Sequence, residues 1–260
     1  MSELSKKNLY LEKAVQALYS DSIPPMRDEN EILITGDRLR RSRLYVPGNQ
    51  PKKILKAGTY SPDCIILDLE DSVPQKEKDN ARIIVRNALR MVDFNGAEKM
   101  VRINSNDTGM IDLEFIIAQN VHVILIPKVE SSDQIIRFVK KINELLKVCG
   151  RREPVFIIPI IESAHGVLNA LEIAKSSPNI IGLTIGLEDY TADLGINKTI
   201  TGEESFFARS MVLHAAKATG IQALDSVHGD FRDEKSLRRS VRESKALGFV
   251  GVGCIHPNQI

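Results

Sequence analysis

The fold of this chain is constrained most by one feature, the regular alternation of apolar runs with amphipathic segments from residue 38 onward. The apolar runs are rich in Ile, Val and Leu, which is typical of buried parallel strands. Eight strands are expected, over residues 43–48, 64–71, 99–105, 121–130, 155–163, 180–189, 222–227 and 249–257. Seven helices are expected between them, over residues 50–58, 75–92, 110–120, 131–149, 166–178, 204–220 and 234–248. Strict strand–helix alternation implies a parallel sheet, either open and doubly wound or closed into a barrel.

The number of repeats favours the closed barrel. Eight strand–helix repeats within about 220 residues fit the (β/α)8 TIM barrel, which typically has about 250 residues. The alternative is a Rossmann-type open sheet, which carries a glycine-rich phosphate-binding turn after its first strand. The corresponding stretch here, "YVPGNQP", has too few glycines to hold a pyrophosphate. The sequence therefore predicts an α/β fold with a (β/α)8 barrel over residues 38–260.

Both ends of the chain depart from the barrel repeat. Residues 1–37 combine a rough helical stripe of leucine and valine with a segment that Pro24 and Pro25 break. Such a short N-terminal extension cannot hold a core of its own, so we expect it to pack on the barrel or on a neighbouring subunit. At the other end, the sequence stops directly after the eighth expected strand, so the C-terminal helix of the barrel is expected to be missing or truncated.

The composition argues against several classes of function. With 35 basic and 34 acidic residues, the chain has no charge excess that would favour nucleic acid or an anionic membrane surface. It contains no apolar run of about 20 residues, the length of a membrane span, and its N-terminus lacks the apolar core of a signal peptide. Its three cysteines have neither metal-binding nor disulfide spacing. We therefore expect a cytoplasmic protein that binds neither nucleic acid nor a membrane.

The C-terminal ends of the expected strands, which form the active site in barrel enzymes, carry many acids. The charged residues and histidines placed there are Asp68, Glu70, Asp71, Arg102, Lys128, Glu130, Glu162, Glu188, Asp189, Asp225, His228 and His256. Glu162 and Asp189 follow neighbouring strands, so their carboxylates are expected to share one mouth and to bind a hard cation such as Mg²⁺. Glu188 is expected to turn away, because consecutive residues of a strand face opposite sides. The alternative is that each acid simply caps the helix that follows it.

Basic residues at the same end are few. Arg102 lies at the end of an apolar strand, where its guanidinium suits two-pronged capture of a carboxylate or of an enolate oxygen. Its alternative role is an ion pair with Glu70 or Asp71, acids that could also hold the metal ligands in place or position water. Lys128 and Glu130 could pair with each other across the mouth or contact the substrate. These side chains are expected to complete the site around the two metal-binding acids.

A magnesium site with an arginine and no evident nucleophile favours chemistry through an enolate. The metal would chelate the carboxylate and ketone oxygens of a 2-oxo acid and act as a Lewis acid. Cleavage of a carbon–carbon bond leaves negative charge on a thioester or carboxylate oxygen, which Arg102 would stabilise. The sequence thus favours a carbon–carbon lyase, with Arg102 and Glu162 as its catalytic residues.

Taken in order, the motifs resemble the HpcH/HpaI aldolase and citrate lyase β-subunit superfamily. The resemblance rests on "RRSRLYVPGNQPKKILKA", "DCIILDLEDSVPQKEKDNAR", "VRINS", "IPKVE", "IIESAHGVLNALEIA", "IGLEDYTADLG" and "GFVGVGCIHPNQI", which together span residues 38–260. The run "EDYTADLG" followed by "FFARS" is most similar to citrate lyase β-subunits and their stand-alone relatives. The resemblance implies a Mg²⁺-dependent lyase on a (β/α)8 barrel that acts on 3-hydroxyacyl thioesters.

The same resemblance implies substrates, partners and site residues. The substrate would be citryl-acyl carrier protein or citryl-CoA, or else malyl-, methylmalyl- or citramalyl-CoA. The products would be a 2-oxo acid such as oxaloacetate and an acetyl thioester. Metal binding falls on Glu162 and Asp189, substrate binding on Arg102, and a contact to substrate or pantetheine on Arg41, the arginine of the "RSxLYVPG" motif. A trimer or hexamer, and contact with other citrate lyase subunits, are implied as assemblies.

One departure from the family pattern leaves alternatives open. Many relatives continue past "IHPxQI" into a helical segment that supplies an acidic proton donor in the CoA-lyase branches, and this sequence stops before it. The first alternative is a class II aldolase acting on 4-hydroxy-2-oxo acids, which needs the same metal and arginine. The second is a non-catalytic subunit of a lyase complex.

Overall fold

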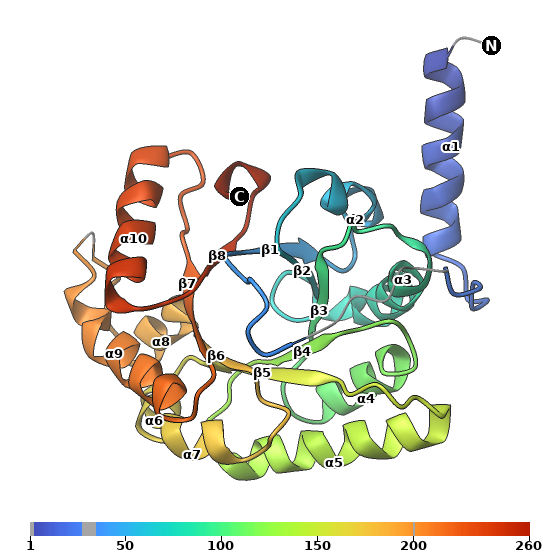
Figure 1. Cartoon of the computed structure of the whole chain (residues 1–260). Coiled ribbons are helices and arrows are strands. Elements are labelled where there is room, and N and C mark those ends of the chain that lie inside the picture. Colours follow the sequence, from blue (N-terminus) through green and yellow to red (C-terminus); the bar gives the residue numbers. More distant parts are fainter. Residues whose placement is uncertain (1–2, 28–34, 200) are drawn as a thin grey trace.

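The eight expected strands are present and close into a parallel barrel (Figure 1). The computed structural model of the chain describes residues 3–27, 35–199 and 201–260, and for residues 3–8 and 10 it describes the backbone only. The strands are β1 (Ser42–Pro47), β2 (Cys64–Asp68), β3 (Glu98–Arg102), β4 (Val123–Ile126), β5 (Phe156–Ile161), β6 (Gly182–Ile185), β7 (Gln222–Val227) and β8 (Val252–Cys254). Each strand pairs with the next, and β8 pairs with β1 to close the ring. The prediction of a (β/α)8 barrel is confirmed.

The helices between strands lie outside the ring and cover it (Figure 1). They are α2 (Pro51–Ala57), α3 (Lys78–Met91), α4 (Asn106–Ile116), α5 (Ser132–Cys149), α6 (Ala164–Leu168), α7 (Ala170–Lys175), α8 (Leu187–Asp193), α9 (Glu203–Ala218) and α10 (Glu234–Leu247). Short 3-10 turns lie at η1 (Gly58–Tyr60), η2 (Gln75–Glu77) and η3 (Pro257–Gln259). α5 starts with a capping box between Ser131 and Gln134 and ends at Gly150, whose φ of 70° suits glycine.

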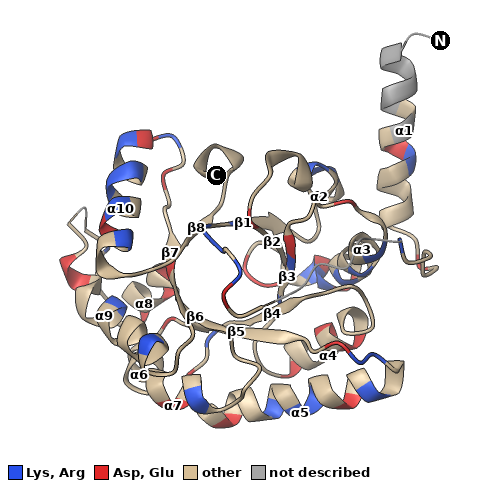
Figure 2. Ribbon diagram, in the orientation of Figure 1, with Lys and Arg blue, Asp and Glu red and all other residues tan. Residues whose placement is uncertain are grey.

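Charges of both signs are mixed on the outer helices. On α5 and α10, basic and acidic residues are interspersed along the helix (Figure 2). Among the described residues, no helix is long and apolar enough to cross a membrane.

Side chains of the strands alternate between the barrel interior and the layer beneath the helices. In β1, Leu44 and Val46 belong to the outer core, whereas Tyr45 packs against the interior cluster. That interior cluster consists of Cys64, Ile66, Met100, Val123, Leu125, Ile158, Ile160, Ile181 and Leu224. The interior is therefore a packed core, and the surface available for chemistry lies at its C-terminal end.

The region around β6 differs from the prediction. β6 ends at Ile185, and the helix α8 begins at Leu187 within the stretch expected to be strand. Glu188 and Asp189 therefore lie in the first turn of a helix. The expectation that strand alternation turns Glu188 away from the mouth was wrong, because Glu188 lies in α8, where strand alternation does not apply.

The helix expected over residues 166–178 is also different, since it forms two helices, α6 and α7, that meet at Asn169. α6 begins earlier than expected because Ser163 caps it, with Ser163 Oγ accepting a hydrogen bond from Gly166 N at 3.1 Å.

The N-terminal helix α1 (Glu3–Leu18) leads away from the barrel, and its last turn is anchored on α3 (Figure 1). Leu18 is fully buried. Asn87 Nδ2 donates to the carbonyl oxygens of Leu18 at 3.2 Å and Ser20 at 2.8 Å, and Arg86 Nη2 donates to that of Asp21 at 3.0 Å. These contacts hold the end of α1 on the barrel, which was one of the two packing partners expected for the extension.

Two predictions about the chain ends stay predictions. Residues 1–2 and 28–34 of the expected extension lie outside the described residues, so the boundary at residue 37 is not tested. Beyond β8, the described chain contains the turn η3 and no further α-helix.

Candidate active site

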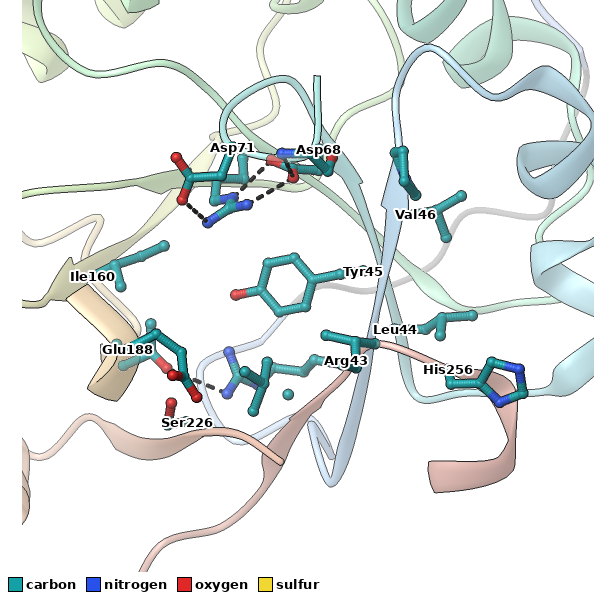
Figure 3. Close-up of a pocket in the computed structure, with 18 of the residues that line it drawn as sticks. Arg43, Leu44, Tyr45, Val46, Asp68, Asp71, Ile160, Glu188, Ser226 and His256 are labelled. Carbon is teal, nitrogen blue, oxygen red and sulfur yellow. Dashed lines mark hydrogen bonds and ion pairs between the residues drawn. The ribbon is translucent and has the colours of Figure 1, made fainter. Parts of the chain in front are cut away.

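A pocket of about 570 Å³ opens at the C-terminal end of the barrel strands (Figure 3). Its walls come from β1, the segment after β2, and the ends of β5, β6, β7 and β8. The residues expected at this mouth that do line it are Asp68, Asp71, Arg102, Glu162, Glu188, Asp189, Asp225 and His256. The sequence therefore located the pocket at the correct end of the barrel.

Arg102, the last residue of β3, is tied to the acids that end and follow β2. Its Nε and Nη2 donate to the two carboxylate oxygens of Asp68, each at 2.7 Å. Its Nη1 lies 3.0 Å from Glu70 Oε2 and 3.5 Å from Asp71 Oδ2, and the guanidinium lies 5.3 Å from the centre of the Tyr45 ring. The ion pair considered as an alternative role for Arg102 is thus formed, with Asp68 as the two-pronged partner.

Burial and pairing set the protonation of this cluster. Burial alone would raise the pKa of Asp68, but the hydrogen bonds and charge of Arg102 hold that pKa below its ordinary value. Burial raises the pKa of Glu70, against the opposing effects of Arg102 and Lys128. Burial alone would lower the pKa of Arg102. The hydrogen bonds and charge of the Asp68 carboxylate have the larger effect, so the pKa of Arg102 is raised. Arg102 is therefore a fixed cation in the pocket wall.

Lys128 links the two sides of the mouth from the segment after β4. Its backbone is left-handed, with φ 54°, and its N–H donates to Glu162 Oε1 at 2.6 Å. Its Nζ donates to Glu70 Oε1 at 2.6 Å and lies 3.6 Å from Asp71 Oδ1 and 3.9 Å from Asp189 Oδ2. One residue thus contacts both the Arg102 cluster and the two acids expected to bind metal.

Glu162 directly follows β5 and is 6% exposed. Burial, and then the negative charge of Asp189, raise the pKa of Glu162 to about 8, against the hydrogen bond from the Lys128 N–H. The carboxylate fits closely against Gly186, where an added Cβ would lie 2.5 Å from Glu162 Oε2. A buried carboxylate that is this difficult to ionise is a place where a bound cation is strongly stabilising.

Asp189 faces Glu162 from the first turn of α8, with its side chain 42% exposed. Its neighbour Glu188 lines the same pocket (Figure 3) but pairs with Lys198 Nζ at 2.5 Å. Asp189 is distinguished from Glu188 by its charge acting on Glu162 and by its proximity to Lys128. Asp189 is accordingly the better second carboxylate for a cation beside Glu162.

The donor set at this point fits Mg²⁺. In the described part of the chain, no group of three or more His, Cys, Asp or Glu side chains is arranged to hold a metal. Mg²⁺ does not need such a group, because it keeps several waters and binds through one or two carboxylates together with the substrate. The buried Glu162 carboxylate with its raised pKa, and Asp189 opposite, supply those two. That these residues bind the ion stays a prediction.

Glu130 does not form the expected pair with Lys128, whose ammonium is bonded to Glu70. Glu130 Oε1 instead accepts a hydrogen bond from Ser163 Oγ at 2.7 Å. Because Ser163 is adjacent to Glu162 and caps α6, Glu130 contacts the segment that carries Glu162. A role of Glu130 in holding that carboxylate stays a prediction.

Arg41 is not brought to the mouth. It precedes β1, at the N-terminal end of the barrel, and its Nε and Nη2 donate to the two carboxylate oxygens of Asp63, each at 2.8 Å. The expectation of a substrate contact is corrected for a geometric reason, since a residue before a barrel strand lies at the end opposite to the active site.

Among the β1 residues that line the pocket, the two with polar side chains were not singled out from the sequence. Arg43 and Tyr45 both line it and are labelled in Figure 3. Strand alternation was the available signal, because Leu44 and Val46 belong to the outer core and their neighbours must face inward. The outer wall also carries three lysines of α2 that were not singled out, Lys52, Lys53 and Lys56.

Two other residues of the mouth have structural partners. The Asp225 carboxylate accepts hydrogen bonds from Arg209 Nη2 and Ser244 Oγ, each at 2.5 Å. The His256 ring caps the turn η3 and stacks on Phe231 at 4.5 Å between ring centres. Neither side chain is free to act as a ligand without breaking these contacts.

Comparisons with known proteins agree with this architecture. A family model described as HpcH/HpaI aldolase/citrate lyase matches residues 41–257. The chain is 40% identical to the citrate lyase subunit beta of Leuconostoc mesenteroides over 232 residues, which cover 87% of this chain and 76% of that protein. It is also 40% identical to the mitochondrial citramalyl-CoA lyase of Mus musculus over 234 residues, which cover 85% of this chain and 69% of that protein.

A solved structure of a similar protein has the same fold. The protein CitE from Mycobacterium tuberculosis, solved in complex with magnesium, acetoacetate and coenzyme A, superimposes with a TM-score of 0.72 at 33% identity. The match covers 85% of this chain and 78% of that one. The chain is accordingly a carbon–carbon lyase of the citrate lyase β-subunit and citramalyl-CoA lyase type, and it belongs to the HpcH/HpaI aldolase/citrate lyase family.

Proposed function

We propose that this chain is a Mg²⁺-dependent lyase that cleaves a 3-hydroxyacyl thioester of CoA or of an acyl carrier protein into a 2-oxo acid and an acyl thioester. The observation that carries the proposal is one pocket with a buried Glu162 carboxylate beside Asp189 and the fixed cation of Arg102. Relatives named citrate lyase subunit beta and citramalyl-CoA lyase support the substrate class. A relative solved with magnesium and coenzyme A supports the metal and the carrier.

Glu162 and Asp189 would hold the ion, which would supply Lewis-acid chemistry toward the oxygens of the substrate. Glu162 is kept in place for this role, because its Oε1 accepts the Lys128 N–H and its Oε2 lies against Gly186. The ligand carboxylate therefore needs little reorganisation when the substrate arrives.

Arg102 acts on the acyl half of the substrate. In cleavage the substrate hydroxyl loses its proton and becomes the 2-oxo group while the carbon–carbon bond breaks. The bonding electron pair stays on the acyl thioester, where the charge spreads onto the thioester oxygen as an enolate, and the enolate carbon then takes up a proton to give the acyl thioester product. Because Asp68 holds Nε and Nη2 of Arg102, the guanidinium cannot swing away and its charge remains where the oxygen becomes negative. The nearby Tyr45 ring limits water around the guanidinium.

The carrier would lie over α2. Lys52, Lys53 and Lys56 form a basic outer wall of the pocket, which suits the phosphate groups shared by CoA and the phosphopantetheine of a carrier protein. We further propose contact with other citrate lyase subunits, which the subunit names of the relatives support. A homo-oligomer, trimeric or hexameric, is proposed from the resemblance to the family alone.

Turnover of citryl-, citramalyl- and malyl-CoA tests the proposal, with the released 2-oxo acid followed through a coupled dehydrogenase. We expect cleavage of at least one thioester with Mg²⁺, loss of activity in excess EDTA, and a fall of about 100-fold or more in Glu162→Gln. Glu172→Gln, which removes an exposed acid from the first turn of α7, is the matched control and should retain full activity. Turnover retained in EDTA or in Glu162→Gln would refute the mechanism.

Free 4-hydroxy-2-oxo acids are assayed alongside the thioesters. Cleavage of these acids without cleavage of any thioester would make the chain a class II aldolase. Capture of an acyl carrier protein without any turnover would make it a non-catalytic subunit.

A further inference from the structure

Arg43 is a buried cation that forms no ion pair with any of the described residues. It is 1% exposed, and its Nη2 donates to Thr184 Oγ1 at 3.2 Å and to the carbonyl oxygen of Asp225 at 2.6 Å. Within the described residues, its Nε and Nη1 have no hydrogen-bond partner. Burying a guanidinium in this way is costly unless another molecule supplies the missing acceptors and negative charge.

Two other buried arginines of the barrel, Arg40 and Arg82, do not share this state. Arg40 Nε lies 2.7 Å from Glu98 Oε2, and Arg82 Nε lies 2.6 Å from Asp112 Oδ1. The fold thus supplies a carboxylate to Arg40 and Arg82, and it gives the buried Arg86 the Asn87 side chain and backbone carbonyl oxygens as acceptors. Arg43 differs from them in lining the pocket.

The Arg43 guanidinium lies beneath Glu162, one of the two acids expected to bind metal. Strand register pairs Thr184 with Ile160, and these residues precede Gly186 and Glu162, respectively, by two positions. Since residues two apart on a barrel strand face the same side in successive layers, the Thr184–Arg43 contact lies one layer below the Glu162 carboxylate. Arg43, Ile160 and Thr184 line the pocket one layer below Glu162 and therefore form its floor. Arg43 and Ile160 are labelled in Figure 3.

Of the four groups on the reacting carbon of the proposed substrate, one remains to contact this floor. The carbon that is separated from the acyl thioester carries a hydroxyl, a carboxylate, the thioester arm and one further substituent. The hydroxyl and carboxylate face the metal-binding acids. The thioester arm must face the opening, because a carrier does not fit inside a pocket of about 570 Å³. The remaining substituent then faces the floor of the pocket, where Arg43 lies.

We infer that Arg43 binds a carboxylate on this remaining substituent, so that the preferred substrate releases a 2-oxo dicarboxylic acid, as a citryl thioester does, and not pyruvate or glyoxylate. The inference rests on the proposed function and names its substrate class. A carboxylate would give the unpartnered N–H groups their acceptors and the buried charge its partner. A methyl group or hydrogen would leave them unpaired, which is how buried polar groups reject a substrate that lacks the matching group.

Binding of unreactive 2-hydroxy acids tests this without turnover. Malate and lactate present the same hydroxyl and carboxylate, and differ in carrying a carboxymethyl or a methyl group. With Mg²⁺ present, the protein should bind malate about 10- to 100-fold more tightly than lactate of matching configuration. Arg43→Met should abolish the preference, and Arg43→Lys should keep part of it. In turnover, Arg43→Met should lower kcat/KM for citryl-CoA and spare citramalyl-CoA.

A stability measurement separates this role from a structural one. Replacing an unpaired buried charge by an apolar side chain of similar length is neutral or stabilising, so the Tm of Arg43→Met should equal or exceed that of the unchanged protein. If the contacts of Arg43 with β6 and β7 serve the fold alone, Arg43→Met will lower the Tm and weaken malate and lactate binding equally.

The outcomes distinguish this inference from the lyase proposal. Equal affinity for malate and lactate, a preference that survives Arg43→Met, or no binding of either acid would overturn the role of Arg43. A malate preference that is lost in Arg43→Met, in a protein that cleaves no thioester, supports the role of Arg43 and refutes the lyase proposal alone.

Discussion

Adding a methyl group at Gly186 tests the expected metal site by pushing on the Glu162 side chain, without changing any charge. Gly186 has φ −107° and ψ 94°, a conformation that alanine adopts readily, so Gly186→Ala leaves the backbone unstrained. The added Cβ would lie 2.5 Å from Glu162 Oε2 and 3.3 Å from Ile160 Cγ2. Ordinary contact begins near 3.4 Å, so the Glu162 carboxylate must retreat by about 0.9 Å.

A retreat of this size is large for a metal ligand. Glu162 is buried, and its Oε1 accepts the Lys128 N–H at 2.6 Å, so the carboxylate cannot move without weakening that hydrogen bond. Metal–ligand distances vary by about 0.2 Å, and misplacing a group at a reaction centre by about 1 Å can cost 100-fold in rate. We therefore expect Gly186→Ala to weaken Mg²⁺ binding by about 10-fold or more and to lower kcat/KM by about 100-fold.

Calorimetric titration with Mg²⁺ and thioester turnover measure the two effects. Gly229→Ala is the matched control, since Gly229 is exposed and its added Cβ would meet Glu188 Oε1 at an ordinary 3.8 Å. Circular dichroism and Tm establish that both variants are folded. Unchanged Mg²⁺ affinity and turnover in a folded Gly186→Ala would refute Glu162 as a metal ligand, because its carboxylate cannot remain where it now lies.

Three other perturbations have defined outcomes. Mg²⁺ at about 100 times its Kd should stabilise the fold by about 2.7 kcal/mol, and the rise in Tm should vanish in Glu162→Gln and persist in Glu172→Gln; a rise retained in Glu162→Gln contradicts the site. Asp112→Ala leaves the buried Arg82 guanidinium with the exposed Asp79 carboxylate as its remaining acidic partner, and it removes the acceptor of two Asn104 N–H groups. It should cost about 3–5 kcal/mol in urea unfolding, whereas a loss below about 1 kcal/mol would show that the buried contacts of Asp112 are dispensable. Burial, with nearby positive charges, lowers the pKa of His122 to about 3, and its Nδ1 accepts the Lys99 N–H at 3.0 Å. The unfolded chain takes up this proton near pH 6.5, so stability should fall as the pH drops below that value, by about 2 kcal/mol at pH 5. His122→Asn should flatten that dependence, and an unchanged slope would exclude His122 as its origin.

The position of Glu162 could be predicted because β5 is a continuous apolar run that stops abruptly at an acid. The position of Asp189 was predicted at the same mouth, but its local structure was not. Leu187 prolongs the apolar run beyond Gly186 and therefore looks like part of a strand, whereas it is the first residue of α8 and packs in the outer core. A short apolar run does not distinguish a strand from the start of a buried helix.

The partners of the charged residues depend on geometry that the sequence does not display. Asp68 and Arg102 meet because they are register partners on β2 and β3. Lys128 reaches Glu162 because of a left-handed backbone at a residue that rarely adopts it. Arg43 could have been found by strand alternation, but its lack of an acidic partner becomes visible once its surroundings are known.

The dual contact of Lys128 sets which amino acids that position tolerates. Its amide bonds Glu162 with φ at 54°, and its ammonium bonds Glu70. Glycine and asparagine adopt this φ readily, so they would keep the amide contact and lose the side-chain tether. Valine, isoleucine and threonine resist it and would lose both. Randomising this codon and selecting for activity should therefore recover glycine and asparagine ahead of every β-branched residue, and recovery of valine instead would show that the backbone angle does not govern the position.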